Sequence, residues 1–555
     1  MENKRIYPTR EILTRLLQVM RHLVPFIGLA VLFAVLGFVT TLAIPSLLII
    51  LSFFALKNQA PSAWYVLVLI GLALARGLFR YGEHYFGHYV AFHSLADLRK
   101  LIFAKLRRLA PAKLDRQDRG KLLKMIGEDI EALEIFFAHT LAPICTGILS
   151  ALLIATYFAG FSPWFTLIAL ATYLMLAIAL PRKFALDLEH FLQEQHQRRT
   201  SYISFFLESL KAMGDLVQFG KVQERFEFLS QKSQQVNQLE RQIAQKQFLQ
   251  QALTFLVVGM AVMLFALTAF YQIQKGQLLL ERAVLALVAF SSSFAPFLEL
   301  GRLPLGFKRA MNAGSNVFGL LDEKEPTQTG QASTVRLEQI SVEDIHFVYD
   351  DRNVPIFEHL SAHFEKGKII GLVGSSGCGK STLMKLLMRW YDPQAGRIIF
   401  TGQDSRDIGR QHLQASFAYV PQTAQLFHQS LRENLLLGKS DISDEAIWDL
   451  AAKCRIKERL EGLPEGLDTI VDGERDFSAG ERQRLELMRA LLKKANCYIF
   501  DEPTSNLDSL NEAAFLSIVK EECQGMVFLI SHRLSTVAFA DEVYELTPSQ
   551  LKRIR

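Results

Sequence analysis

The chain has few cysteines, few charges for its length and no basic tail. Its 5 cysteines in 555 residues lack the spacing of a metal site or a disulfide framework, which predicts free thiols in a reducing compartment. The net charge of +5 is small for this size and gives nucleic-acid binding no support. We expect no cleavable signal peptide, because the uncharged run Leu23 to Leu56 is far longer than a signal core.

Long uncharged runs fill the first part of the chain. A membrane-spanning helix needs about 20 apolar residues. Six such segments are predicted, at residues 23–56, 62–92, 140–160, 163–181, 252–273 and 283–304. The long connections are rich in Lys and Arg and the short ones are poor in charge, so the positive-inside rule places the amino terminus in the cytoplasm. We expect the long connections to be helical arms that reach another domain, in preference to solvated connectors.

The second apolar segment carries ionisable residues on one helix face. They recur every four positions: Arg76, Arg80, His84 and His88. Such groups at membrane depth usually face a bundle interior or a watery cavity. They are interpreted as the lining of a substrate pathway, as a pair between Arg80 and Glu83 near the inner surface, or as metal or haem ligands at His84 and His88. Glu299 and Arg302 raise the same question on the sixth segment.

The rest of the chain reads as a soluble domain. A polar stretch at 322–335 is interpreted as a linker between a membrane domain at 1–321 and a second domain at 336–555. There, a short apolar run is followed by a segment that fits the P-loop pattern G-x-x-x-x-G-K-[ST]. Its residues are Gly374, Ser375, Ser376, Gly377, Cys378, Gly379, Lys380, Ser381 and Thr382.

The P-loop pattern predicts an ATP site with bound Mg²⁺. Its glycines let backbone N–H groups surround phosphate oxygens at the start of a helix. Lys380 is expected to neutralise the β- and γ-phosphates and Ser381 to hold Mg²⁺. Farther on, the apolar run 497–500 ends in Asp501 and Glu502. Asp501 is the predicted Mg²⁺ ligand and Glu502 the predicted general base for the attacking water.

In these and further motifs the chain resembles the ATP-binding cassette family, and within it the exporter half-transporters. The resemblance implies an adenine-stacking ring at Tyr349, a Mg²⁺-sensing glutamine at Gln422 and a switch histidine at His532. It also implies that Ser478 and Gly480 of the signature motif contact the γ-phosphate, and that Asp508 communicates between two cassettes.

The implied fold is an all-α six-helix transmembrane domain with long cytoplasmic helical extensions, followed by an α/β P-loop nucleotide-binding domain with an α-helical subdomain. The signature motif departs from the common form at Phe477, Ala479 and Glu481. Glu481 places a carboxylate near phosphate, which indicates a subfamily variant or impaired turnover.

The resemblance implies ATP-driven export of an unidentified small molecule or peptide across a cell's inner membrane, with the ATPase domain cytoplasmic. In that family two half-transporters form a homodimer or a heterodimer within the bilayer. Residues 213–220 and 291–294 resemble the thiol exporters of cytochrome bd assembly. Three alternatives stay open: an importer of the same fold, a non-transporting ATPase, and an ATP-regulated membrane sensor that uses His84 and His88.

Overall fold

The computed structural model describes residues 7–113, 119–301, 303–325, 327, 330, 332, 335–349, 352, 354–439, 441–505, 509–548 and 550–555. The chain divides into two compact units. The helical unit holds Lys4–Lys105 and Gln117–Glu323, and the α/β unit holds Leu106–Arg116 and Lys324–Arg555. The predicted fold class, a six-helix membrane domain followed by an α/β nucleotide-binding domain, is confirmed.

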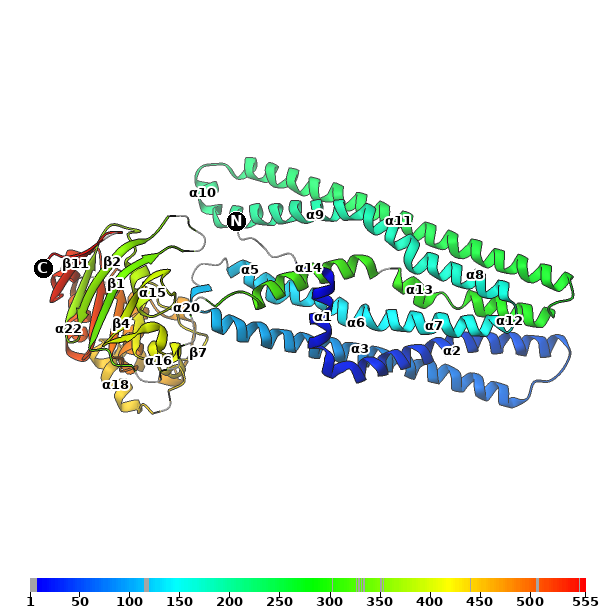
Figure 1. The fold of residues 1–555 in the computed structure, drawn as a ribbon, viewed down its shortest axis with the longest axis horizontal. Helices are drawn as coiled ribbons and strands as arrows, with labels where there is room; N and C mark the ends of the chain where they lie inside the picture. The colour runs from blue at the N-terminus through cyan, green and yellow to red at the C-terminus, as the bar shows by residue number, and fades with distance from the viewer. Residues whose placement is uncertain are drawn as a thin grey trace. The chain divides into compact units, whose positions relative to one another are not determined.

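The helical unit has six apolar segments, within the described residues, that are long enough to cross a membrane. They are Arg21–Leu56, Ala63–Leu109, Leu122–Ala159, Pro163–Leu188, Val222–Gln274 and Leu280–Leu300. The helices that compose this part of the chain are α1 (Thr9–Val19), η1 (Arg21–Leu23), α2 (Val24–Leu56), α3 (Ala63–Leu109), α5 (Arg119–Lys124), η2 (Met125–Asp129), α6 (Ile130–His139), α7 (Leu141–Ala159), α8 (Pro163–Leu174), η3 (Met175–Ala179), α9 (Leu180–Lys211), α10 (Met213–Gln218), α11 (Val222–Gln274), α12 (Leu280–Ser291), α13 (Ala295–Leu300) and α14 (Leu303–Leu321) (Figure 1).

Two helices are too long to end at the membrane surface. Helix α3 has 47 residues and α11 has 53. At 1.5 Å per residue they extend about 70 and 80 Å, whereas the hydrocarbon core is about 30 Å thick. Helix α11 runs beside α9, to which it is tied by hydrogen bonds such as Arg198 Nη1 to Gln235 Oε1 at 2.8 Å. The short helix α10 joins the two, so this long connection is a helical arm (Figure 1).

The sixth apolar segment is interrupted, whereas the sequence predicts one span at 283–304. Helix α12 ends at Ser291 and α13 begins at Ala295, with Pro296 in its first turn. Proline has no N–H to continue a helical hydrogen-bond ladder. The buried Ser293 hydroxyl donates to the carbonyl oxygen of Phe290 at 2.7 Å and lies 2.5 Å from the Tyr173 hydroxyl. These contacts satisfy polar groups where the helix breaks.

Aromatic rings form the core beside this break. Phe265 stacks on Phe165 with ring centroids 4.2 Å apart and on Phe290 at 4.5 Å. All three side chains are fully buried. Their contacts join α8, α11 and α12 without any hydrogen bond. Packing of this kind holds membrane helices together because lipid tails supply no hydrophobic driving force between them.

The described residues of the α/β unit form three sheets. A six-stranded sheet has the order β12-β11-β3-β10-β9-β6, a four-stranded antiparallel sheet has the order β2-β1-β4-β5, and β7 pairs with β8. The strands are β1 (Gln339–Phe347), β2 (Phe357–Glu365), β3 (Ile369–Val373), β4 (Ala395–Phe400), β5 (Gln403–Asp404), β6 (Phe417–Val420), β7 (Gln429–Ser430), β8 (Ile470–Val471), β9 (Cys497–Asp501), β10 (Met526–Ile530), β11 (Glu542–Leu546) and β12 (Leu551–Arg553).

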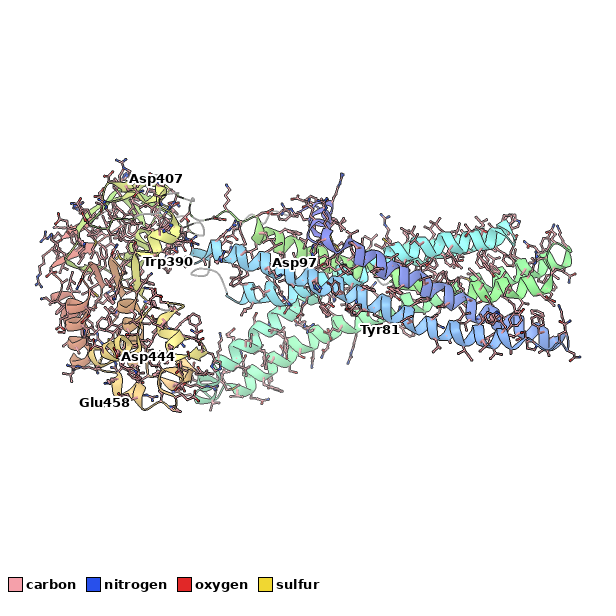
Figure 2. All side chains as sticks on the ribbon, turned by 90° about the horizontal axis from the view of Figure 1, so that it is seen from below. Tyr81, Asp97, Trp390, Asp407, Asp444 and Glu458 are labelled. Atoms are coloured by element: carbon pink, nitrogen blue, oxygen red, sulfur yellow. The ribbon has the colours of Figure 1, made fainter. Side chains whose placement is uncertain are left out.

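Helices cover the parallel part of the six-stranded sheet and form a helical subdomain, on which Figure 2 labels Asp444 and Glu458. Strands β9 and β10 are buried along their whole length, which explains why both read as continuous apolar runs. The helices are α15 (Lys380–Leu387), η4 (Ser405–Asp407), α16 (Arg410–Ala415), α17 (Leu431–Leu436), α18 (Asp444–Lys453), α19 (Lys457–Glu461), η5 (Gly466–Asp468), α20 (Gly473–Asp476), α21 (Ala479–Leu492), α22 (Ser509–Glu522) and α23 (Leu534–Ala538).

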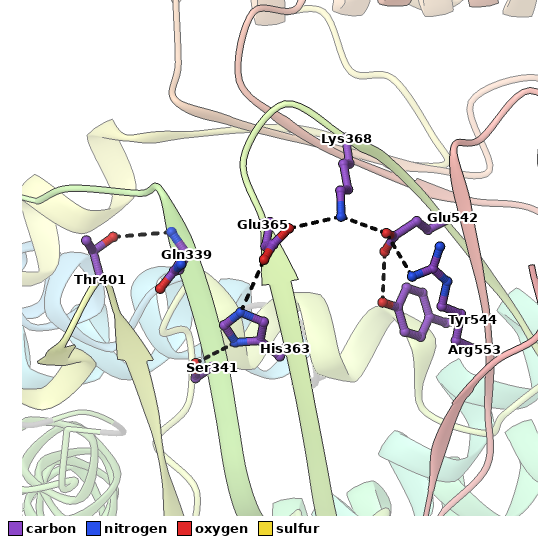
Figure 3. Close-up of polar contacts among 9 residues, drawn as sticks. All are labelled: Gln339, Ser341, His363, Glu365, Lys368, Thr401, Glu542, Tyr544 and Arg553. Atoms are coloured by element: carbon purple, nitrogen blue, oxygen red, sulfur yellow. Dashed lines mark hydrogen bonds and ion pairs between the residues drawn. The ribbon is translucent and has the colours of Figure 1, made fainter.

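An ion-pair network joins the antiparallel sheet to the far edge of the parallel sheet (Figure 3). Lys368 donates to Glu365 at the end of β2 at 3.0 Å and to Glu542 of β11 at 2.8 Å. Arg553 of β12 approaches the same carboxylate at 3.1 Å. The hydrogen bond from Lys368 holds the pKa of Glu542 below its usual value.

Candidate functional site

The P-loop turns tightly between β3 and α15. Gly374, Gly377 and Gly379 have φ angles of 153°, 82° and 106°, which side chains rarely adopt. A Cβ atom at Gly379 would lie 2.7 Å from the Phe357 ring, and one at Gly374 would lie 2.7 Å from the carbonyl oxygen of Leu546. Only glycine fits at these two positions, so the loop backbone is free to approach a ligand closely.

Lys380 begins α15 and reaches back over this loop. Its side chain is buried, and its Nζ donates to the carbonyl oxygens of Gly374 at 2.8 Å and Ser375 at 3.0 Å. Ser375 and Ser376 are exposed on the loop, whereas Cys378 is buried under it. A phosphate group in the loop would offer stronger, charged acceptors to the same ammonium group.

Tyr349 is covered in this structure. It is only 8% exposed, and its hydroxyl lies 3.0 Å from the hydroxyl of Thr382 on α15. Its ring meets Phe347 and Tyr391 edge-on, with centroids 4.8 and 5.3 Å away. The residue therefore stands beside the P-loop, as a ring that stacks on adenine requires, but its face is packed against the protein.

Three polar residues meet at the ends of parallel strands. Gln422 follows β6, Glu502 follows β9 and His532 follows β10. Gln422 Nε2 donates to Glu502 Oε2 at 2.9 Å, and His532 Nε2 lies 3.2 Å from Glu502 Oε1. Ligands of open α/β sheets bind at the carboxyl ends of the strands. The structure thus brings together the three residues that the sequence nominates for catalysis.

The register of the strands produces this convergence. Val420 pairs with Phe500, and Asp501 pairs with Ile530, so the three strands end at the same level. Glu502 has a φ angle of 52°, and its N–H donates to the carbonyl oxygen of Ile530 at 2.9 Å. A non-glycine residue held in this strained region is typical of functional sites.

The three side chains that the sequence nominates for Mg²⁺ all carry oxygen atoms that could act as ligands. Asp501 ends β9, is 8% exposed, and accepts a hydrogen bond from the Tyr419 hydroxyl at 3.2 Å. Ser381 contributes a hydroxyl group at the start of α15. Gln422 uses its amide nitrogen to bind Glu502, which leaves its amide oxygen as an acceptor. Hydroxyl, carboxylate and amide oxygens are the hard ligands that Mg²⁺ prefers.

The signature motif forms a helix cap. Glu481 Oε2 accepts from the Ser478 N–H at 2.8 Å and from the Ser478 hydroxyl at 2.9 Å, and Ser478 Oγ accepts from the Glu481 N–H at 3.3 Å. Arg459 Nε lies 3.5 Å from the other oxygen of Glu481. The pattern S-x-x-E is the sequence signature of this capping box, so Glu481 has a structural role that the sequence already indicates.

The remaining candidates are not brought to the P-loop of their own chain. Ser478 caps α21 and Gly480 lies in the first turn of that helix. Among the described residues, neither of them makes a hydrogen bond with the P-loop. Asp508 lies outside the described residues. Arg459 and Tyr419 are contacts of the site that the sequence did not predict, because Arg459 belongs to no motif and Tyr419 stands in the Gln422 motif without a role of its own.

Both parts of the chain match known protein families. Residues 357–505 match the family described as "ABC transporter", and residues 27–297 match "ABC transporter transmembrane region". A "Probable ABC transporter ATP-binding/permease protein" of Haemophilus influenzae is 35% identical over 86% of each chain. The chain belongs to the ABC transporter family. It is therefore a multi-pass membrane ATPase that binds ATP and couples its hydrolysis to transport.

Two further relatives of this ABC transporter have names that state what they move. An "ATP-dependent lipid A-core flippase" of Chromobacterium violaceum is 28% identical over 90% of this chain and 86% of its own. The "Glutathione/L-cysteine transport system ATP-binding/permease protein CydC" of Escherichia coli is 28% identical over 87% and 84%. A solved bacterial Atm1-family ABC exporter with ATP bound has the same fold, with a TM-score of 0.79, 24% identity and coverage of 96% and 95%.

The helical unit of the transporter contains a cavity of about 610 Å³ between α2, α3, α6, α7 and α13, in which ionisable side chains lie among apolar ones. The ionisable face of α3 lines it, and Glu299 of α13 does too.

Arg80 donates to Glu83 at 2.9 Å, so the predicted pair forms and the residues also line a cavity. The rings of His84 and His88 are parallel, with centroids 6.0 Å apart. No group of three or more His, Cys, Asp or Glu residues suited to a metal occurs in the described part of the chain. Arg302 lies outside that part.

Proposed function

We propose that the chain is one half of a dimeric ABC exporter in a cell's inner membrane. Residues 1–321 form its membrane domain, 322–335 its linker and 336–555 its cassette, with the amino terminus and the cassette in the cytoplasm. The Lys- and Arg-rich long connections support this orientation. ATP is hydrolysed at two composite sites between the cassettes, and the energy drives a solute outward.

The convergence of Gln422, Glu502 and His532 supports this proposal most strongly. Glu502 acts as the general base that takes a proton from the attacking water. His532, 3.2 Å from that carboxylate, holds it in place and contacts the γ-phosphate once ATP is bound. Gln422, held on the other carboxylate oxygen, senses whether Mg²⁺ and phosphate are present.

The phosphates bind in the P-loop, from Gly374 to Thr382. Its backbone N–H groups and the start of α15 face the phosphate oxygens, and Lys380 leaves its carbonyl partners for them. Ser381, Gln422 and Asp501 would hold Mg²⁺, which neutralises charge on the β- and γ-phosphates when bound. Tyr349 stacks on adenine after its ring turns away from its contacts with Phe347 and Tyr391.

The second half-transporter completes each site. Ser478 and Gly480 of one chain are proposed to contact the γ-phosphate held by the other, and Asp508 to communicate between the sites. Closure shifts the membrane helices only if ATP binds the closed dimer more tightly than the open one. Helix α10 is proposed to transmit this movement, because Val217 and the adjacent Phe219 are exposed at the end of the arm. The other proposed coupling segment, Asp115 to Met125, lies partly outside the described residues.

The test is ATP turnover of the full-length protein purified in lipid, expressed alone and together with candidate partner chains. Turnover by the chain alone that is lost in Glu502→Gln supports a homodimer with two working sites. Turnover that appears only with a partner chain supports a heterodimer. Turnover that persists in Glu502→Gln would contradict the proposed site. Inside-out vesicles then test direction, because an exporter accumulates its solute inside them when ATP is added.

A further inference from the structure

The cavity of the helical unit has room for a ligand of moderate size. Small residues of α2, namely Ala30, Ala34 and Gly37, form part of its wall. Its volume of about 610 Å³ lies within the range of small-molecule sites. Arg76 stands 13 residues after the start of α3, which is about 20 Å along a helix, so it lies within a hydrocarbon core about 30 Å thick.

Two charges of opposite sign line this cavity without a partner. Arg80 and Glu83 neutralise each other. By contrast, neither Arg76 nor Glu299 forms a hydrogen bond or an ion pair with any residue that the structure describes, including each other. An unpaired charge at membrane depth is costly and is normally matched by a countercharge. Both side chains are exposed at the cavity, so their charges are available to a bound ligand.

Two further polar atoms at the cavity lack hydrogen bonds. Thr146 is 8% exposed, and its hydroxyl has no partner among the described residues. His88 Nδ1 is buried without a hydrogen bond, and its nearest charged neighbour, Glu134 Oε1, is 3.8 Å away. Buried polar groups without partners are rare in proteins and need an explanation such as a bound ligand. Both residues belong to the cavity wall.

We propose that this cavity binds a small zwitterion, the class that includes amino acids and short peptides. Its carboxylate pairs with Arg76 and its ammonium group with Glu299, while Thr146 and His88 hydrogen-bond to it. This inference rests on the proposed exporter function, and it names the class of solute exported. A lipid with a purely anionic headgroup fits less well, because it would pair with Arg76 and leave Glu299 with a second negative charge nearby.

The decisive experiment compares three forms of one probe. Alanyl-alanine carries both charges, its N-acetyl form only the carboxylate, and its C-terminal amide only the ammonium group. Binding of each is measured by equilibrium dialysis against the full-length protein in phosphatidylcholine nanodiscs. We expect the affinity for alanyl-alanine to be at least about tenfold higher than that for either blocked form. The reason is that each lost charged hydrogen bond lowers the affinity by about this factor.

Two variants assign the charges to their residues. In Arg76→Gln, binding of alanyl-alanine falls about tenfold or more and removal of the carboxylate has no further effect. In Glu299→Gln, binding of alanyl-alanine falls by a similar factor, and removal of the ammonium group has no further effect. Lys57→Gln and Glu281→Gln are matched controls, because these two residues pair with each other outside the cavity wall. The controls should bind like the unaltered protein.

Three results would overturn the inference: equal binding of the three forms, absence of binding by all of them, or displacement of the dipeptide by phosphatidylglycerol in the nanodisc. The last would assign the cavity to an anionic lipid. ATP turnover of the unaltered protein, measured in the same preparation, separates the two proposals. If ATP is hydrolysed at Glu502 and no dipeptide binds, the substrate class is wrong and the exporter function stands. If ATP is hydrolysed neither by the chain alone nor together with any candidate partner chain, the exporter function itself is wrong.

Discussion

The two polar sites of this transporter differ in how their charges are satisfied. In the cassette, the Glu502 carboxylate is held on one oxygen by Gln422 and approached on the other by His532. In the membrane cavity, Arg76 and Glu299 have no partner among the described residues. The cassette is organised in advance for one constant reaction, the hydrolysis of ATP. The cavity leaves its charges to be matched by whatever solute this transporter carries.

This difference follows from the chemistry that each site performs. A transition state is stabilised most by groups that are already oriented, because no energy is then spent on reorganisation during the reaction. A transport site must instead bind and then release its ligand. Strong internal pairs such as Arg80–Glu83 would compete with the ligand, so some charges must stay unpaired.

Glu502→Gln removes the proposed general base but keeps the shape of the side chain. We expect turnover to fall about 10²- to 10⁴-fold while ATP binding is retained. The measurement is phosphate release, with nucleotide binding measured separately. Glu521→Gln, an exposed glutamate of α22, is the control. A fall in turnover of less than about threefold would show that another group acts as the base and that Glu502 is not catalytic.

Glu542→Gln tests a charge pair of the cassette that lies outside its active site. The variant should lose about 1–3 kcal/mol of unfolding free energy at neutral pH, because the carboxylate accepts hydrogen bonds from Lys368 and Tyr544. The pKa of Glu542 is lowered by folding, so its contribution is present above the ordinary glutamate pKa of 4.5 and is lost as the pH falls through the folded value.

Thermal unfolding of the Glu542→Gln variant and of the unaltered protein should therefore converge in acid. Glu545→Gln, an exposed neighbour on β11, serves as the control and should not change stability. If the difference in unfolding temperature between Glu542→Gln and the unaltered protein stays constant down to pH 3, the effect comes from packing and not from charge.

Glu481→Gln and Glu481→Ala distinguish two roles of the unusual signature residue. Glutamine can also form a capping box, so Glu481→Gln should leave turnover within about threefold. Alanine removes the contacts with Ser478 and Arg459, which should destabilise α21 by about 1 kcal/mol. If Glu481→Gln instead raises turnover tenfold, the carboxylate repels phosphate and the cassette is not fully organised for catalysis.

Tyr173→Phe tests the polar contact at the break in the sixth apolar segment. It removes the contact with Ser293, whose hydroxyl still donates to the carbonyl of Phe290. The expected loss is about 0.6 kcal/mol, the average for hydrogen bonds between membrane helices. Unfolding in mixed micelles measures it, with Tyr157→Phe as the control. A loss above 3 kcal/mol would show that the membrane half depends on internal polar pairs as the cassette does.

Much of the cassette could be predicted because its chemistry constrains short segments. The P-loop must combine glycines with Lys380, and an apolar strand must end at Asp501 and Glu502, so both are readable without a structure. The membrane-spanning helices could also be predicted, because each of them needs about 20 apolar residues. The sequence could not predict that Tyr349 is covered or that Arg459 accompanies Glu481, because these depend on segments far apart in the chain.

The two kinds of domain, their order along the chain and the residues proposed to bind phosphate could all be predicted from the amino-acid sequence. Each of these depends on a local pattern of apolar length or loop chemistry. Only the tertiary structure decided that the sixth apolar segment breaks near Ser293, that Gln422 and His532 meet at Glu502, and that Arg76 shares a cavity with Glu299. Such contacts arise from strand register and helix packing, which bring together residues separated by tens to hundreds of positions.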